Sequence, residues 1–272
     1  MKKLTTFLTA LLVSLSVWAV EIVDVVVSVN VDDGIQQGVI SYQKGKKQPD
    51  LLFVLVPGSP SIFRPEVNGG KLNTSTPLYG NFVIRSREYL IDENSMTLVV
   101  DCHSKIGDVC TQKYQSSKQR FNHLKKLIDD VKVAYPTVRE VWLMGTSFGT
   151  ITSGFSALHG KDYFNGAVHS ATINPTAEHS YPILSELNYK DISAKQIFVH
   201  HKKDDCTKSD YKYISELTKA GNFPLVSVSG GYGWKGDVCQ AMTAHGFKGK
   251  EEDVMKGVLT MIRSKQFSSR DI

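Results

Sequence analysis

The sequence predicts an α/β protein with a mainly parallel sheet and helices on both of its faces. From residue 51 onward, short apolar segments alternate with amphipathic ones, as strands alternate with helices around a parallel sheet. The apolar segment 51–56 is unbroken, which indicates a strand buried on both faces. The chain has 272 residues, enough for one such domain with a single core.

The elements can be placed in order along the chain. Two strands are expected before residue 51, with a turn at Asp32–Asp33–Gly34 between them. The expected strands cover 21–29, 37–43, 51–56, 96–101, 141–144, 166–170, 196–200 and 223–228. The expected helices cover 80–91, 118–135, a segment after residue 149, 207–220 and 248–263. The connection 174–195 leaves room for only a minimal cover, and the polar tail from Ser264 is expected to be loose.

The amino terminus differs in character from the rest of the chain. Two lysines follow Met1, and an apolar run over 4–18 leads to Ala19, the pattern of a secretory signal peptide. The alternative is a membrane anchor, but the run is short for a span. We therefore expect a signal peptide over 1–19, a single domain over 20–272, and export to the periplasm or beyond the cell.

Composition excludes several classes of protein. The body of the chain has no long apolar segment, so no stable membrane insertion is expected once the signal is removed. The formal net charge is only +5, and lysines and arginines do not cluster among aromatic residues, which argues against nucleic acid as a partner. Nothing in the sequence predicts a cofactor. Composition leaves the oligomeric state open.

The most informative segment is Gly145–Thr146–Ser147–Phe148–Gly149. A short apolar run precedes it, and small and apolar residues at helical spacing follow it. Strand, sharp turn and helix are the context of the nucleophile elbow G-x-S-x-G. The two glycines would let the strand and helix backbones approach closely, and Ser147 would project at the carboxyl end of the strand.

The motif and the order of elements resemble the α/β-hydrolase superfamily, in particular exported, esterase-like serine hydrolases. The resemblance covers nearly all of the chain after the signal peptide and implies a catalytic triad in the chain order serine, acid, histidine. The sequence has eight histidines, but only His245 follows the last expected strand, so His245 is the expected base. The resemblance places the acid a few residues after the strand 196–200, where Asp204 fits best and Asp205 is one residue further.

The same resemblance implies an oxyanion hole made of two backbone N–H groups. Phe148 should supply one and Ser59, in the loop after the strand 51–56, the other. Gly58 would permit the turn. Many relatives carry His-Gly-x where this chain has Pro57–Gly58–Ser59, and no Gly-Gly-Gly run follows, which speaks against the lipase branch that has this run.

The four cysteines suggest two disulfides in an exported chain, and three pairings are possible. Within the resemblance, the acid and base loops must touch. This favours Cys206–Cys239, which leaves Cys102–Cys110 to close a small local loop.

Two groups of residues, a histidine pair and three aromatic side chains, could contact a ligand. His200 and His201 are adjacent, but no matching ligand spacing follows them, so no metal site is expected. Phe63, Tyr232 and Trp234 could line a substrate pocket, or they could pack onto the protein itself.

The sequence as a whole predicts a secreted serine hydrolase that cleaves an ester or other acyl bond of a small molecule through Ser147, Asp204 and His245. A peptidase or amidase with the same triad is one alternative. A non-catalytic binding protein on the same scaffold is the other.

Overall fold

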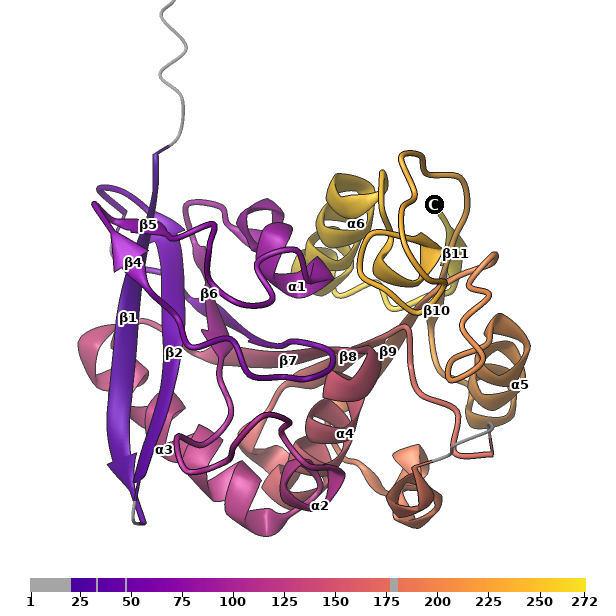
Figure 1. Cartoon of the computed structure of the whole chain (residues 1–272), viewed down its shortest axis with the longest axis horizontal. Helices are drawn as coiled ribbons and strands as arrows, with labels where there is room; N and C mark the ends of the chain where they lie inside the picture. The colour runs from indigo at the N-terminus through magenta and orange to yellow at the C-terminus, as the bar shows by residue number, and fades with distance from the viewer. Residues whose placement is uncertain (1–20, 33, 47, 177–180) are drawn as a thin grey trace, which may run out of the picture.

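The computed structural model describes residues 21–272 apart from residues 33, 47 and 177–180. The expected signal peptide, residues 1–19, lies outside the described residues. Two layers of helices enclose a central sheet (Figure 1). Within the described part of the chain, no helix is both long and apolar enough to cross a membrane.

The sheet has nine strands among the described residues, in the order β1-β2-β6-β3-β7-β8-β9-β10-β11. These strands are β1 (Ile22–Val31), β2 (Gly34–Gln43), β3 (Leu51–Val56), β6 (Ser95–Val100), β7 (Glu140–Thr146), β8 (Gly166–Ser170), β9 (Lys195–His201), β10 (Leu225–Val228) and β11 (Arg270–Asp271). β1 and β2 form an antiparallel hairpin, and β2 pairs antiparallel with β6. All pairings from β6 to β11 are parallel, which confirms the predicted mainly parallel sheet.

Helices cover both faces of the sheet, as the sequence predicts. The α-helices are α1 (Phe82–Arg85), α2 (Gln112–Gln115), α3 (Lys118–Ala134), α4 (Thr150–Gly160), α5 (Tyr211–Gly221) and α6 (Glu251–Ser264). Buried residues of α3, α4 and α5 belong to one hydrophobic core, and those of α1 and α6 to the core on the opposite face. Figure 1 shows the two groups of helices on either side of the sheet.

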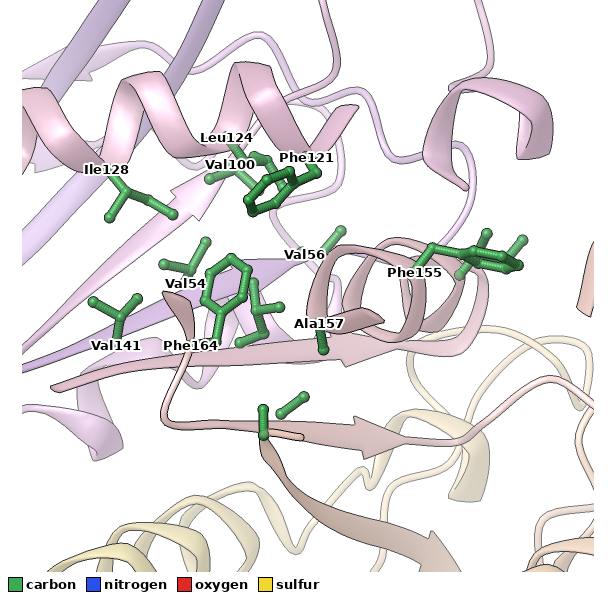
Figure 2. Close-up of a cluster of buried hydrophobic side chains, with 14 of the residues drawn as sticks. Val54, Val56, Val100, Phe121, Leu124, Ile128, Val141, Phe155, Ala157 and Phe164 are labelled. Carbon is green, nitrogen blue, oxygen red and sulfur yellow. The ribbon is translucent and has the colours of Figure 1, made fainter. Parts of the chain in front are cut away.

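Strand β3 shows why a continuous apolar run is needed at the centre of the sheet. Its six residues are all buried. Val54 and Val56 face the core under α3 and α4, whereas Phe53 and Leu55 face the core under α1 and α6. Figure 2 shows the first of these cores, in which Phe121 and Leu124 of α3 share one cluster with Val54 and Val56 of β3. A polar residue at any of these positions would lie in an apolar layer on one side or the other.

The predicted helix over 80–91 is wrong in its middle. The structure has α1 and then a separate 3₁₀ helix, η1 (Arg87–Leu90), with a break at Ser86. The hydroxyl of Ser86 donates to the carbonyl oxygen of Phe82, a local bond that competes with continued helix. Arg87 then turns inward, where its guanidinium forms a buried ion pair with Asp24 at 2.7 Å.

The carboxyl-terminal tail is not loose as predicted. Residues Arg270–Asp271 form β11, which pairs in parallel with β10 at the edge of the sheet. Phe267 stacks on Trp142 with ring centroids 5.7 Å apart, so the tail also covers part of the core. The tail is held by an aromatic contact and by main-chain pairing with β10. Neither interaction has a local signal in the sequence.

The loops that approach the carboxyl ends of the strands contain little regular structure. Residues 57–81 include the short hairpin β4 (Val67–Asn68) and β5 (Lys71–Leu72). The connection after β8 contains only the 3₁₀ helices η4 (Pro182–Glu186) and η5 (Tyr189–Asp191) among its described residues. This agrees with the predicted minimal cover in place of a lid domain.

Candidate active site

Ser147 follows β7 directly and precedes α4, with a short 3₁₀ turn, η2 (Ser147–Gly149), between them. Its φ is +51°, in the left-handed region that costs energy for a residue with a Cβ. Such strain persists only where the surroundings impose it, and here the turn from strand to helix does so. This is the strand–turn–helix that the motif predicts.

The two glycines of the motif are required by close contacts. A Cβ on Gly145 would lie 2.5 Å from the carbonyl oxygen of Gly149, and one on Gly149 would lie 2.4 Å from the carbonyl oxygen of Val56. No side chain fits at either position. The end of β3, the end of β7 and the start of α4 therefore meet around Ser147 with backbone against backbone.

The loop after β3 passes directly beside the serine. A Cβ on Gly58 would lie 3.3 Å from the Cβ of Ser147 and 3.3 Å from the carbonyl oxygen of Thr146. Ser61 closes the loop: its N–H donates to the oxygen of Gly58 at 2.7 Å, and its hydroxyl donates to that of Pro57 at 2.7 Å. Ser59 is exposed at the tip of this turn and lines the cavity.

His245 lies in the 3₁₀ helix η6 (Ala244–Gly246), after β10, and Asp204 lies just after β9. The Nδ1 atom of His245 is 2.9 Å from Oδ2 of Asp204, and both side chains are buried. Because a carboxylate only accepts, Nδ1 is the protonated nitrogen. His245 Nε2 has no hydrogen-bond partner among the described residues, so it is free to accept a proton. Asp205, the alternative acid, is exposed.

Besides His245, three other groups contact the carboxylate of Asp204. Its Oδ1 accepts from the N–H of Cys206 at 3.1 Å, and its Oδ2 accepts from the hydroxyl of Ser209 at 2.9 Å. His200 Nε2 lies 3.2 Å from the same Oδ2.

These contacts decide the charge of Asp204. Burial would by itself raise the pKa of the carboxyl group, but the contacts with His200 and His245 outweigh it. The pKa of Asp204 therefore lies well below its ordinary value of 3.8. From the sequence, His200 was considered only as a metal ligand, and Ser209 was missed. The one feature of the sequence that points to Ser209 is its position five residues after Asp204.

Two disulfides join or close loops that carry residues of the site. Cys206–Cys239 joins the loop of Asp204 to the loop that precedes His245, and Cys102–Cys110 closes the segment after β6. Both pairings are those expected from the sequence. The N–H of Cys110 donates to the oxygen of Pro60 at 2.9 Å, so this second disulfide supports the loop that carries Ser59.

Ser147 and His245 line one cavity of about 580 Å³ at the carboxyl ends of the strands. Its walls come mainly from the segments 58–59, 78–82, 146–147 and 235–246. Leu78, Phe82 and Met242 give the walls an apolar character, and no acidic side chain among the described residues lines them. A small, mainly apolar acyl or alcohol group fits such a cavity.

The aromatic residues suggested as pocket walls do not line this cavity. Phe63 is completely buried in the core beside α1 and α6. Tyr232 is 76% exposed, and the Trp234 ring packs edge-on against His201. Phe63 and Trp234 thus pack onto the protein itself, the second of the two possibilities left open by the sequence, whereas Tyr232 is mainly exposed to solvent and fits neither.

The described residues offer a poor metal site. Asp204, Cys206 and His245 bring ligand atoms within 4.8 Å of one another, but the sulfur of Cys206 is in a disulfide and cannot act as a thiolate. Both ring nitrogens of His201 are used by protein groups, the N–H of Lys203 and the oxygen of Gly230.

Comparison with known proteins gives likeness in structure alone. No protein-family model matches the chain, and no curated protein matches it in sequence. Among solved structures, Est1E from Butyrivibrio proteoclasticus superposes with a TM-score of 0.58 at 12% identity, over 88% of this chain and 98% of that one. XC6422 from Xanthomonas campestris, described as an α/β serine hydrolase without lid, gives 0.57 at 11% identity, over 91% and 96%.

A larger protein shares the same architecture. The acylaminoacyl peptidase of Pyrococcus horikoshii superposes with a TM-score of 0.55 at 15% identity, over 90% of this chain but only 42% of that one. At these identities the likeness concerns the fold, and the side chains of the site must be judged from their own geometry.

Proposed function

We propose that this chain, which has the α/β-hydrolase fold, is a serine hydrolase that cleaves esters of small, mainly apolar acids or alcohols. The single observation that carries the proposal is a group of three side chains, two of which line one cavity while the third binds one of those two. Ser147 lies on a strained turn in its wall, His245 lies in the same wall with Nε2 free, and Asp204 binds the opposite ring nitrogen. The proposal assigns catalytic roles to these three residues.

The reaction follows from those positions. His245 Nε2 takes the hydroxyl proton as Ser147 Oγ attacks the carbonyl carbon of the ester. The N–H groups of Ser59 and Phe148 stabilise the negative oxygen of the tetrahedral intermediate. The bond to the leaving alcohol then breaks, His245 returns the proton to it, and water releases the acid from Ser147 by the same steps.

An ester is the substrate that the cavity favours. The walls are mainly apolar and without carboxylates, and the volume of about 580 Å³ suits a compound of low molecular mass. A peptidase or amidase remains the second candidate, because the acylaminoacyl peptidase of Pyrococcus horikoshii shares the fold. Parallel assays with p-nitrophenyl esters and the matching p-nitroanilides separate the two.

The decisive experiment is labelling with a fluorophosphonate probe. We expect the wild-type protein to label and to hydrolyse short p-nitrophenyl esters, and Ser147→Ala to do neither. Ser185→Ala is the matched control, because Ser185 is an exposed serine in η4, far from any role proposed here. Folded wild-type protein that neither labels nor hydrolyses would refute the proposal and favour a binding protein on the same scaffold.

Export remains part of the proposal. The sequence pattern over residues 1–19 is that of a signal peptide. Two disulfides suit an oxidising compartment. Amino-terminal sequencing of protein recovered from the periplasm and the medium tests it, and an intact Met1 would contradict cleavage after Ala19.

A further inference from the structure

We propose that the side-chain amide of Asn81 is a third donor to the negatively charged oxygen formed during catalysis, in addition to the two backbone N–H groups. This inference rests on the function proposed above. Asn81 precedes α1, is only 8% exposed, and lines the same cavity as Ser147. Sequence reasoning gave this residue no role.

The orientation of the amide is fixed by its own helix. Asn81 is the N-cap of α1, and its Oδ1 accepts from the N–H of Val83 at 3.3 Å. A backbone N–H can only donate, so the side-chain atom that faces it must be the oxygen. The opposite atom of the amide, facing away from the helix, is therefore Nδ2 with its two N–H groups.

Nδ2 is the unused polar group of this residue. The main-chain N–H of Asn81 donates to the oxygen of Leu78 at 2.7 Å, and its carbonyl oxygen accepts from Ile84 and Arg85. Within the part of the chain that the structure describes, no hydrogen bond engages Nδ2. An amide that is nearly buried, lines a cavity and keeps its donors free is ready for a ligand that accepts.

The position of Nδ2 is set by the contacts around Gly58. The point where a Cβ on Gly58 would lie is 3.3 Å from Asn81 Nδ2 and 3.3 Å from the Cβ of Ser147. Asn81 Nδ2 and the Cβ of Ser147 are therefore separated by no more than twice that distance. A carbonyl bonded to Ser147 Oγ has its oxygen in this region, beside the turn at Gly58 and Ser59.

This arrangement explains a feature of the loop. The chain lacks the Gly-Gly-Gly run and the histidine that many hydrolases carry after β3. Pro57 and Pro60 in this loop have no N–H, so the loop offers few backbone donors. A side-chain amide next to Gly58 supplies a donor there, and its helix cap fixes it before the substrate arrives. A preorganised donor of this kind stabilises charge that develops in the transition state.

The test replaces Asn81 without losing its cap. Asn81→Asp keeps an oxygen for the N–H of Val83 and has nearly the same shape, but it has no N–H to donate. Asn81→Ser also keeps a capping oxygen and remains neutral, but it is too short to reach the substrate. We expect kcat for a p-nitrophenyl ester to fall about 10²- to 10³-fold in both variants, with KM changed less than about threefold.

Two further readouts separate catalysis from structure. The inhibition constant of a trifluoromethyl ketone, which forms a negatively charged adduct with the serine, should rise by the same factor by which kcat/KM falls. The melting temperature should change by no more than about 3 °C. Ser117→Ala is the matched control, because Ser117 caps α3 in the same way and should lose stability without losing kcat.

Each outcome has one meaning. A kcat within threefold of wild type in Asn81→Asp and Asn81→Ser, or a rise in KM alone, overturns the role of Asn81 while the function of Ser147 stands. An inactive, unlabelled wild-type protein removes both proposals. A fall in kcat with an unchanged inhibition constant for the ketone also overturns the inference, because the amide would then not contact the charged oxygen.

Discussion

The carboxylate of Asp204 has nearly all its acceptor positions occupied. Oδ1 binds the N–H of Cys206, and Oδ2 is shared by Nδ1 of His245 and the hydroxyl of Ser209. A carboxylate held in this way cannot rotate, so it fixes the ring of His245 with Nε2 toward the cavity. In the reaction proposed above, its charge would also stabilise the imidazolium formed when His245 takes a proton.

The two adjacent aspartates provide a matched pair of variants. Asp204→Asn should lower kcat about 10³-fold or more, because an amide at this position can donate to Nδ1 and favour the wrong tautomer of His245. Asp205→Asn should stay within about twofold of wild type, because Asp205 is exposed and has no contact with His245. The measurement is ester hydrolysis at neutral pH, and the opposite ranking would assign the acid to Asp205.

The depressed pKa of Asp204 also predicts how stability depends on pH. A group whose pKa is lower in the folded state stabilises the fold above its ordinary value of 3.8, and this contribution is lost as pH falls through the folded pKa. The free energy of unfolding of wild type should therefore fall more steeply below pH 4 than that of Asp204→Asn. Urea unfolding at several pH values measures it; parallel curves would contradict the prediction.

Parts of the site could be predicted from the sequence because they carry local patterns. The tiny residues around Ser147 and the position of His245 after the last large strand are of this kind. Spacing favoured Asp204 over Asp205 but left Asp205 open as the acid, because spacing along a loop does not tell which side chain turns inward. Ser209 lies only five residues after Asp204, but its residue type does not reveal that it binds the carboxylate. Asn81 comes from a distant segment, and nothing local marks it.

At the scale of elements, each disulfide supports one loop of the site. Cys206–Cys239 joins the loops of the acid and the base, across 33 residues of sequence. Cys102–Cys110, across 8 residues, holds the main-chain N–H that binds Pro60 in the loop beside Ser147. The segment 229–240 is exposed throughout, so the disulfide is a main restraint on the chain that leads to His245.

Replacing both Cys206 and Cys239 with serine should destabilise the protein by up to about 4 kcal/mol through the entropy of the unfolded chain. It should also lower kcat, because His245 would sample positions away from Asp204. Thermal unfolding and ester hydrolysis measure the two effects. The comparison variant replaces Cys102 and Cys110. The disulfide between them closes a shorter loop, so its loss should lower stability less. A wild-type kcat without Cys206–Cys239 would contradict the restraint.

Helices and strands were predictable to different degrees. The buried strands β3, β6 and β8 were placed within one residue, because their apolar runs are bounded by polar residues. The long helix α3 was also placed well, since Ser117 caps it and Pro136 follows it. The helix predicted over 80–91 was wrong, because the ion pair between Arg87 and Asp24 of β1 overrides the local pattern.

At the scale of the whole molecule, the tail completes the sheet. The N–H of Ile272 donates to the oxygen of Ser227 at 2.9 Å, and the N–H of Ser229 donates to the oxygen of Ile272 at 2.8 Å. The hydroxyl of Ser269 accepts from the N–H of Leu225 at 3.1 Å. Without these residues, β10 would be an open edge next to β9.

Removal of residues 267–272 should therefore cost about 2–4 kcal/mol of stability, through the loss of β11 and of the Phe267 stacking on Trp142. Ester hydrolysis at 20 °C should remain within about twofold of wild type, because none of these residues lines the cavity. Phe267→Ala should show part of the loss. An unchanged melting temperature in the truncated protein would show that the tail does not stabilise the sheet.

The overall architecture was predictable because it follows from alternation of strands and helices, which the sequence repeats from residue 51 to its last helix. The pairing of the tail was not, because it joins residues more than 40 positions apart through main-chain bonds. Main-chain pairing depends little on residue type, and two residues are too few to show a pattern.

The backbone contacts at Gly58, Gly145 and Gly149 have a consequence for how such a protein could acquire new specificities. Substitution is closed at Gly145 and Gly149, because a Cβ there would collide with backbone atoms, whereas a Cβ on Gly58 would be in tight contact at 3.3 Å with Ser147, Thr146 and Asn81. Most of the remaining cavity wall comes from the segments 78–82 and 235–246, which are far apart in sequence. Mutational libraries should yield altered substrate preference from those two segments, and only inactive protein from Gly145 and Gly149.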